Sequence, residues 1–208
     1  MSPFPSQVKI VEVGPRDGLQ NEAVILSTDR KIELINELAD TGLSSIEAGA
    51  FVQPRKIPQL ADSEKVFKGI RRNANTCYIG LVPNDKGMDR AVVANVDEIA
   101  IFTAASESFC HHNINCSIEE SLQRFKPVIQ RAKNLNIPVR AYISCVLGCP
   151  YEGVIPTAVV INLAERLFNL GCGEISLGDT IGVGTPLVAQ HLVREVMQRV
   201  PIDQLVIK

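Results

Sequence analysis

Short runs of apolar and β-branched residues alternate along the chain with longer stretches in which apolar residues recur at helical spacing. Most of the short runs are nearly continuous in apolar character, which is typical of parallel strands that are covered on both faces. The predicted strands are Val8–Glu12, Ser45–Glu47, Thr76–Val82, Glu98–Phe102, Pro138–Val146, Glu174–Gly178 and Gln204–Ile207.

Four of the intervening stretches carry residues that typically start or stop helices. These are the apolar stripe from Ile32 to Ala39 followed by Gly42, the capping box of Ser117 and Glu120, the helix between Pro156 and Gly171, and the helix that begins at Thr185-Pro186.

Seven strands with helices between them, at roughly one unit per 30 residues, predict repeated βαβ units. Two architectures fit this alternation: a TIM barrel and an open doubly wound sheet. A complete barrel has eight strands in about 250 residues, whereas this sequence reaches its seventh predicted strand at Gln204–Ile207. No linker-like stretch divides the chain, so we expect residues 1–208 to form a single α/β domain.

Composition narrows the class of protein. The chain has 208 residues, is 46% hydrophobic and carries a formal net charge of -2. Because no run rich in Lys and Arg stands out, we expect no nucleic-acid partner, and no apolar run approaches the roughly 20 residues that span a bilayer. Met1–Ser6 resembles neither a secretory signal nor a transit peptide. The six cysteines form no C-x-x-C pair, so we expect no zinc ribbon. A chain of this length with a good core needs no disulfides, so we expect reduced thiols and a cytoplasmic protein.

Polar residues gather where the predicted strands end, which is the end of a TIM barrel that carries the chemistry. Strand by strand they are Arg16, Asp17 and Gln20; Glu47; Asn84; Ser106, Glu107, His111, His112 and Asn113; Tyr142 and Ser144; and Ser176, Asp179 and Thr180. Loops are polar in any protein, but the repetition at the same end of each unit predicts convergence on one ligand.

The most informative of these residues follow the first two strands. Asp17 offers a carboxylate to a hard divalent cation, and Arg16 could neutralise a developing oxyanion; a solvated ion pair in an exposed turn explains them equally simply. Glu47 follows an apolar strand and is expected to be half-buried, so it needs a partner. Arg16 is the natural one, in a structural salt bridge or in an arrangement that orients the arginine for catalysis.

Other candidates carry weaker signals. Gly182-Val183-Gly184 after Asp179-Thr180 could approach a phosphate, but it lacks the rest of a dinucleotide fingerprint and also fits a flexible loop. We expect His111-His112 to lie in a solvent-exposed loop, because adjacent side chains point apart. His191 is expected at the surface or in packing. Cys145 and Cys149 are expected to be small packing residues.

Five segments together resemble the 3-hydroxy-3-methylglutaryl-CoA lyase family across essentially the whole chain. They are Glu12–Glu22, whose core is Gly-Pro-Arg-Asp-Gly; Ala104–Glu107; Asn113–Ser121; Gly148–Gly153; and Glu174–Gly182. Related isopropylmalate, homocitrate and citramalate synthases share the Arg-Asp-Gly core but usually differ around it.

The resemblance implies an incomplete TIM-type (β/α) barrel that binds one Mg²⁺ or Mn²⁺. It implies cleavage of an acyl-CoA substrate, 3-hydroxy-3-methylglutaryl-CoA, to acetyl-CoA and acetoacetate in leucine degradation. The family also suggests a homodimer.

The resemblance further implies a role for each matching residue. Asp17 is a metal ligand, and the metal orients the substrate and acts as a Lewis acid. Arg16 stabilises the enolate oxygen of the leaving acetyl-CoA, and Glu47 holds Arg16 in place. Asp179 is a candidate for moving the hydroxyl proton. The residues that line the substrate site are Arg16, Gln20, Tyr142, Ser176 and Thr180, with Asn113 near the CoA arm.

One departure from the family pattern shapes the expected activity. The family's His-x-His metal ligands, its later Asn ligand and its general-acid Cys do not occur after Ile207, where the sequence reads Lys208. We therefore expect little turnover by this chain unless those groups are supplied. The alternatives are a related acyl-CoA condensing synthase and a catalytically inactive truncated fragment.

Overall fold

A computed structural model describes residues 8–208, so the expectation that Met1–Ser6 carry no leader lies outside the described residues. The described chain forms two compact units. Unit 1 contains the chain up to Val82 together with Lys86–Glu98, and unit 2 contains Pro83–Asp85 and Ile99–Lys208.

Unit 1 alternates strands and helices as the sequence predicts. Its elements are β1 (Val11–Glu12), the π-helical turn η1 (Gly14–Gly18), α1 (Thr28–Asp40), β2 (Ser45–Ala50), the 3-10 turn η2 (Pro58–Leu60), α2 (Ser63–Gly69), β3 (Cys77–Leu81) and, from its second residue on, α3 (Asp85–Val93).

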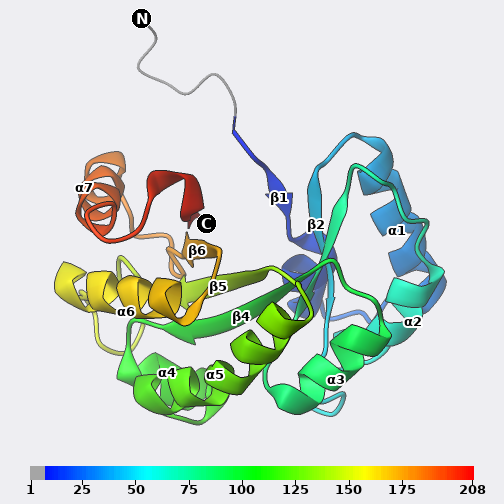
Figure 1. The fold of residues 1–208 in the computed structure, drawn as a ribbon, viewed down its shortest axis with the longest axis horizontal. Helices are drawn as coiled ribbons and strands as arrows, with labels where there is room; N and C mark the ends of the chain where they lie inside the picture. Colours follow the sequence, from blue (N-terminus) through cyan, green and yellow to red (C-terminus); the bar gives the residue numbers. More distant parts are fainter. Residues whose placement is uncertain (1–7) are drawn as a thin grey trace, which may run out of the picture. The chain divides into compact units, whose positions relative to one another are not determined.

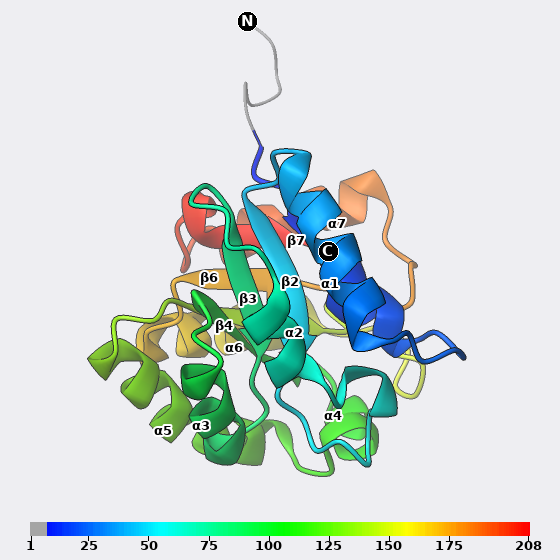
Figure 2. The same ribbon diagram turned by 90° about the vertical axis from the view of Figure 1, so that its right-hand side faces the viewer.

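The strands of unit 1 pair in parallel, β1 with β2 and β2 with β3. Figure 2 shows β2 and β3 side by side. All six residues of β2 are buried, as expected for a parallel strand covered on both faces. The pairing of β2 with β3 shifts register between Glu47 and Gly49, and such irregularities are common next to functional sites.

Unit 2 continues the alternation through the rest of the chain. Its elements are β4 (Glu98–Ala104) from its second residue on, α4 (Glu107–Ile114), α5 (Ile118–Asn134), β5 (Val139–Ser144), α6 (Thr157–Leu170), β6 (Glu174–Leu177), α7 (Pro186–Val196), the 3-10 turn η3 (Ile202–Gln204) and β7 (Leu205–Ile207).

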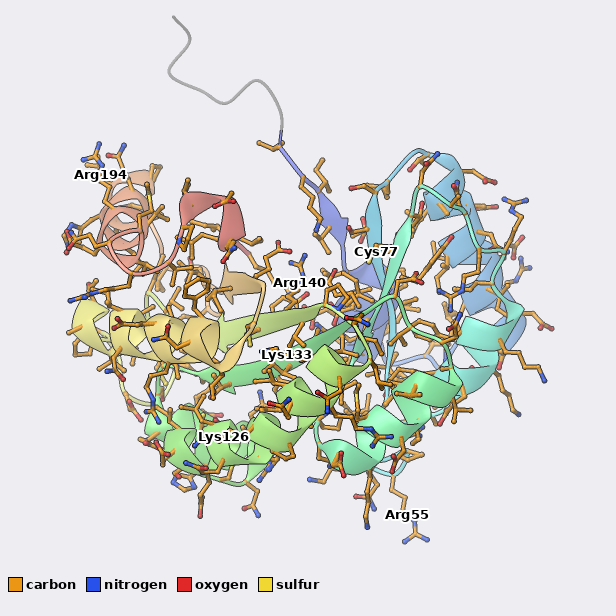
Figure 3. All side chains as sticks on the ribbon, in the orientation of Figure 1. Arg55, Cys77, Lys126, Lys133, Arg140 and Arg194 are labelled. Atoms are coloured by element: carbon orange, nitrogen blue, oxygen red, sulfur yellow. The ribbon has the colours of Figure 1, made fainter. Side chains whose placement is uncertain are left out.

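The four strands of unit 2 also pair in parallel and in chain order. Figure 1 shows β4 beside β5, with α4 and α5 below them in that view. Near the start of β5, Arg140 is 1% exposed and donates to Glu174 on β6 at 2.7 Å. Figure 3 shows Arg140 among the strands, whereas Arg194 projects away from α7. A buried arginine needs such a carboxylate partner.

The structure confirms the predicted strands with shifted boundaries. The first strand begins at Val11 rather than Val8. Val8 and Ile10 are largely exposed, so their side chains do not pack against the core as those of a buried strand would. The second strand continues past Glu47 to Ala50. Helices α2, α3 and α4 were not among the helices marked in the sequence, although Ser106 caps α4 and its hydroxyl accepts from the N–H of Phe109.

The predicted helix signals are present. Ser117 and Glu120 form the reciprocal capping box of α5. Thr185 caps α7, and Pro186 is its first residue. Pro156 precedes α6, and Gly171 ends it with a φ of 108°, a left-handed conformation that glycine adopts without strain.

Among the helices of the described chain, none combines the length and apolar character that crossing a membrane requires.

Candidate active site

The residues after β1 form a tight π-helical turn rather than the exposed turn considered above. The carbonyl oxygen of Val13 accepts from the backbone N–H groups of Arg16, Asp17 and Gly18 at 3.1, 2.7 and 3.4 Å. Pro15 fits at the start of the turn because a first-turn residue needs no N–H donor. Single π turns of this kind often occur at functional sites.

This turn buries the side chain of Arg16 against the middle of β2. Arg16 Nε donates to Glu47 Oε1 at 2.9 Å, and Arg16 Nη2 donates to Glu47 Oε2 at 3.0 Å. The expected pairing is therefore present, and its two-point geometry is the strong, directional form of an arginine–carboxylate contact. The expectation that Glu47 is half-buried is wrong. It is fully buried, because β2 continues for three residues beyond it.

Asp17 lies beside this pair and is more accessible. Its Oδ1 accepts from Arg16 Nη1 at 2.7 Å, and its side chain is 35% exposed. Arg16 is thus held between two carboxylates, one buried and one facing outward. Within residues 8–208, no three His, Cys, Asp or Glu side chains come together in a way that could hold a metal ion.

Gln20 follows the same turn and is half-buried. Its side-chain oxygen Oε1 is inaccessible to solvent and has no hydrogen-bond partner among the described residues. A buried acceptor without a hydrogen bond lowers the stability of the fold by about 1–3 kcal/mol. The Oε1 atom of Gln20 could therefore accept a hydrogen bond from a bound ligand.

In unit 2, two candidate residues lie level with each other on neighbouring strands. Tyr142 on β5 pairs in register with Ser176 on β6, and both are buried. The hydroxyl of Ser176 has no hydrogen-bond partner in the described chain. Lys208 Nζ lies 5.1 Å from the centre of the Tyr142 ring, within the range of a cation–π contact.

The loop after β6 places the remaining strand-end candidates. Thr180 Oγ1 accepts from the backbone N–H of Cys145 at 2.7 Å. Asp179 accepts from the backbone N–H groups of Val183 and Gly184 at 3.1 and 2.7 Å. The glycine-rich segment therefore folds back on the Asp179 carboxylate, and its N–H groups are not free for a phosphate.

Asn113 lies on α4 and is exposed. The expectation that His111 and His112 occupy a loop is wrong, since both belong to this helix, although both are exposed as expected. The His112 ring stacks on Tyr151 with centroids 4.2 Å apart. Because this contact depends on the distant Gly148–Gly153 segment, no local pattern in the sequence predicts it.

Sequence reasoning missed a buried contact near these residues. Cys149 Sγ lies 3.0 Å from Ser106 Oγ. Burial alone would raise the pKa of the Cys149 thiol, but hydrogen bonds from Ser106 and from the N–H groups of Tyr151 and Glu152 lower it below its usual value. Cys145 and Cys149 are buried as predicted, but Cys145 has a φ of 61°, a strained conformation for a residue with a Cβ.

The candidate residues thus fall into two groups. Unit 1 brings together Arg16, Asp17 and Glu47, and Gln20 follows Arg16 and Asp17 just after the same turn. Unit 2 contains Asn113, Tyr142, Ser176, Asp179 and Thr180, of which Tyr142 and Ser176 are in register. The first group offers a held positive charge and an outward carboxylate, and the second offers hydroxyl groups.

Comparison with known sequences identifies relatives along the whole chain. The HMGL-like family matches residues 7–208. "3-Hydroxy-3-methylglutaryl-CoA lyase, cytoplasmic" of Rattus norvegicus is 55% identical over 100% of this chain and 60% of its own length. "Hydroxymethylglutaryl-CoA lyase, mitochondrial" of Macaca fascicularis is 55% identical over 97% of this chain and 62% of its own length. The chain therefore spans about 60% of the length of the curated relatives it matches.

Solved structures give the same picture. Hydroxymethylglutaryl-CoA lyase from Pseudomonas aeruginosa is 48% identical, with a TM-score of 0.95 over 98% of this chain and 68% of that one. An HMG-CoA lyase from Acinetobacter baumannii, in complex with coenzyme A and 3-methylmalate, is 37% identical, with a TM-score of 0.94 over 100% of this chain and 68% of that one. These matches, with seven strands alternating with helices, confirm the incomplete TIM-type barrel.

Proposed function

Because the chain belongs to the HMGL-like family, we propose that it carries the enolate-stabilising part of a lyase that cleaves 3-hydroxy-3-methylglutaryl-CoA to acetyl-CoA and acetoacetate. The observation that carries this proposal is the buried guanidinium of Arg16, held at two points by Glu47. Cleavage of the carbon–carbon bond leaves an electron pair on the acetyl-CoA fragment as an enolate. A fixed cation beside the enolate oxygen lowers the barrier because it needs no reorganisation during the reaction.

In this proposal Arg16 is the catalytic cation, and Glu47 is the residue that positions it. Glu47 occupies two of the donor groups of Arg16 and fixes the plane of the guanidinium. Since Glu47 is fully buried, it contacts Arg16 rather than solvent.

Asp17 is the proposed ligand of a divalent metal, Mg²⁺ or Mn²⁺. Its outward, partly exposed carboxylate supports this role, but the described residues fit such an ion only in part. A selective divalent site needs several oxygen ligands, and Asp17 is not part of any group of three candidate ligands within residues 8–208. When bound, the metal would supply Lewis-acid chemistry at the substrate oxygens.

The residues of unit 2 are proposed to bind the acyl-CoA substrate. The unpartnered hydroxyl of Ser176 beside Tyr142 supports a polar contact with the acyl group, as does the buried oxygen of Gln20 in unit 1. Thr180 is proposed to line the substrate site as well, and Asn113 is proposed to lie near the CoA arm. The relative from Acinetobacter baumannii was solved with coenzyme A, which supports this class of ligand.

Asp179 is proposed to move the proton of the substrate hydroxyl. Its two oxygens each accept one loop N–H, and a carboxylate retains further lone pairs that can accept a proton. These two hydrogen bonds fix the direction of the carboxylate before substrate arrives.

Membership of the family also supports proposals about the domain, the oligomeric state, the pathway and the location of the protein. We propose a single lyase domain over residues 1–208, a homodimer, and a role in leucine degradation in the cytoplasm. The relatives are named as cytoplasmic in one case and mitochondrial in another, so localisation by microscopy of the tagged chain tests that part.

Acetoacetate formation from 3-hydroxy-3-methylglutaryl-CoA with Mg²⁺ tests the activity. The chain is assayed alone and joined to the portion of the rat relative that it does not match. We expect the joined protein to form acetoacetate and Arg16→Gln to lower the rate about 10³-fold. The proposal is wrong if neither preparation forms acetoacetate, or if acetyl-CoA and a 2-oxo acid release free CoA instead.

A further inference from the structure

Unit 1 contains a buried lysine that the proposed chemistry does not use. Lys31 lies in the first turns of α1 and is 3% exposed. Its Nζ donates to the carbonyl oxygen of Gln59 at 2.5 Å and to Asp62 Oδ1 at 2.6 Å. Thr28 donates to the other oxygen, Asp62 Oδ2, at 2.7 Å. A buried ammonium is costly without partners, so this segment is built around Lys31.

The segment that Lys31 holds reaches the loop that follows Arg16. Gln59 Nε2 donates to the carbonyl oxygen of Glu22 at 2.9 Å. Glu22 lies two residues after Gln20, in the stretch that leads from the π-helical turn to α1. One side of Gln59 is therefore fastened to Lys31, and the other side holds the continuation of the Arg16 turn.

The same segment also reaches the strand that carries Glu47. Ser63 Oγ donates to the carbonyl oxygen of Leu60 at 2.8 Å and accepts from the N–H of Ala50 at 3.0 Å. A Cβ at Gly49 would come within 2.7 Å of Ser63 Oγ, so the backbone approach here requires glycine. Residues 59–63 thus contact both the loop after Arg16 and the end of β2 beyond Glu47.

We propose that Lys31 is a positioning residue that holds residues 59–63 against the loop after Arg16 and the end of β2, and so keeps Arg16 and Gln20 in place for substrate. This inference rests on the proposed function for its kinetic consequence only. Lys31 does not touch the reacting atoms and acts through Gln59 and Asp62.

The test compares four variants. Lys31→Met removes the ammonium but keeps the apolar stem, and Lys31→Arg keeps a charged hydrogen-bond donor at this position. Gln59→Ala removes the side-chain hydrogen bond to Glu22 but keeps the backbone carbonyl that Lys31 contacts. It tests the same connection if Lys31→Met fails to fold. Arg55→Met is the matched control, because Arg55 belongs to the same loop yet is exposed, and Figure 3 shows it projecting outward.

Two measurements are made on each variant. Hydrogen–deuterium exchange of the chain follows amides 19–27 and 51–62 against the rest of unit 1. The values of kcat and KM for 3-hydroxy-3-methylglutaryl-CoA are measured in whichever preparation above turns over. We expect Lys31→Met to speed exchange in those two stretches and to lower kcat/KM about 10- to 100-fold, the size of a misplacement of about 1 Å. We expect Gln59→Ala to speed amide exchange and lower kcat/KM as well, with the faster exchange confined to residues 19–27. Lys31→Arg should recover most of the lost kcat/KM. Arg55→Met should change neither the exchange nor kcat/KM.

The outcomes separate this inference from the proposed function. Exchange that rises equally throughout unit 1 in Lys31→Met, or kinetics that stay at the wild-type value despite local exchange, overturns the positioning role. If no preparation turns over substrate, the proposed function fails, and the exchange pattern alone decides whether Lys31 holds the two stretches.

Discussion

Unit 1 and unit 2 prepare their candidate residues in different ways. In unit 1, Arg16 already has two charged partners, Glu47 and Asp17, and the pair with Glu47 is buried. In unit 2, the hydroxyl of Ser176 is buried without a partner in the described chain, and the carboxylate of Asp179 accepts from backbone N–H groups of its own loop. Unit 1 therefore holds a charged side chain in place with buried partners, which costs desolvation energy. Unit 2 instead keeps a buried hydroxyl whose hydrogen-bonding capacity is available to a ligand.

The largest expected effect comes from breaking the fixed charge of unit 1. Arg16→Gln leaves Glu47 buried without its cation, which we expect to lower the free energy of unfolding by about 3–5 kcal/mol. Urea unfolding measures this loss. The double variant Arg16→Gln with Glu47→Gln should recover part of it, because it removes the unpaired charge. A double variant no more stable than Arg16→Gln would contradict the account.

A smaller effect is expected in unit 2 from the loop after β6. Asp179→Ala removes the acceptor of two backbone N–H groups, so we expect a loss of about 1–2 kcal/mol. Asp179→Asn keeps one good acceptor and should lie between Asp179→Ala and the wild type in thermal unfolding. Equal stability of Asp179→Ala and wild type would mean that solvent replaces both bonds.

The charge network of unit 1 should also show in the pH dependence of stability. Burial would raise the pKa of Asp62, but hydrogen bonds from Lys31 and Thr28 outweigh it and lower the pKa below its usual value. A carboxylate with a lowered folded-state pKa contributes stability above its unfolded value of about 4, and the contribution is lost as the pH falls through the folded pKa. Unfolding of Asp62→Asn and wild type from pH 7 to 2 should converge at the acid end. A gap that widens toward low pH would reverse the sign and refute this.

The smallest effect on stability is expected at Ser176. Ser176→Ala removes a buried hydroxyl that has no protein partner, so the free energy of unfolding should change by less than about 1 kcal/mol, toward greater stability. The KM for substrate should rise at the same time, because the ligand loses a hydrogen bond. Clear destabilisation by Ser176→Ala would show that the hydroxyl serves the fold, and the contrast between the two units would disappear.

The sequence predicted the helix ends well because a helix is capped by side chains that lie within one turn of its end. Ser117 with Glu120 and Thr185 with Pro186 satisfy backbone groups within one turn, so the motif alone is sufficient. The strand ends were less predictable. Val8 and Ile10 look like strand residues, yet whether they belong to a strand depends on a neighbouring partner and an apolar cover that lie elsewhere in the chain.

The candidate site divides in the same way. The contact between Arg16 and Glu47 was foreseen because Arg16 follows β1 and Glu47 lies on β2, the neighbouring parallel strand. Lys31 could have been found, since it shares a helix face with Ile35 and Ala39 at spacings of four, and all three are buried. The unpartnered hydroxyl of Ser176 and the contact between Ser106 and Cys149 could not, because both depend on packing between segments that are distant in sequence.

The π-helical turn at Gly14–Gly18 constrains the number of residues in this motif as well as their identity. A π turn holds one residue more per hydrogen-bonded loop than an α turn. Removing Gly14 or Pro15, which precede Arg16, would rotate Arg16 relative to β1 by about 100° around the local axis. The guanidinium would then swing away from Glu47 even if Arg, Asp and Gly all remained. A one-residue deletion scan across this turn should therefore be less tolerated than point substitutions at Gly18, where an added Cβ would meet nothing within 4 Å.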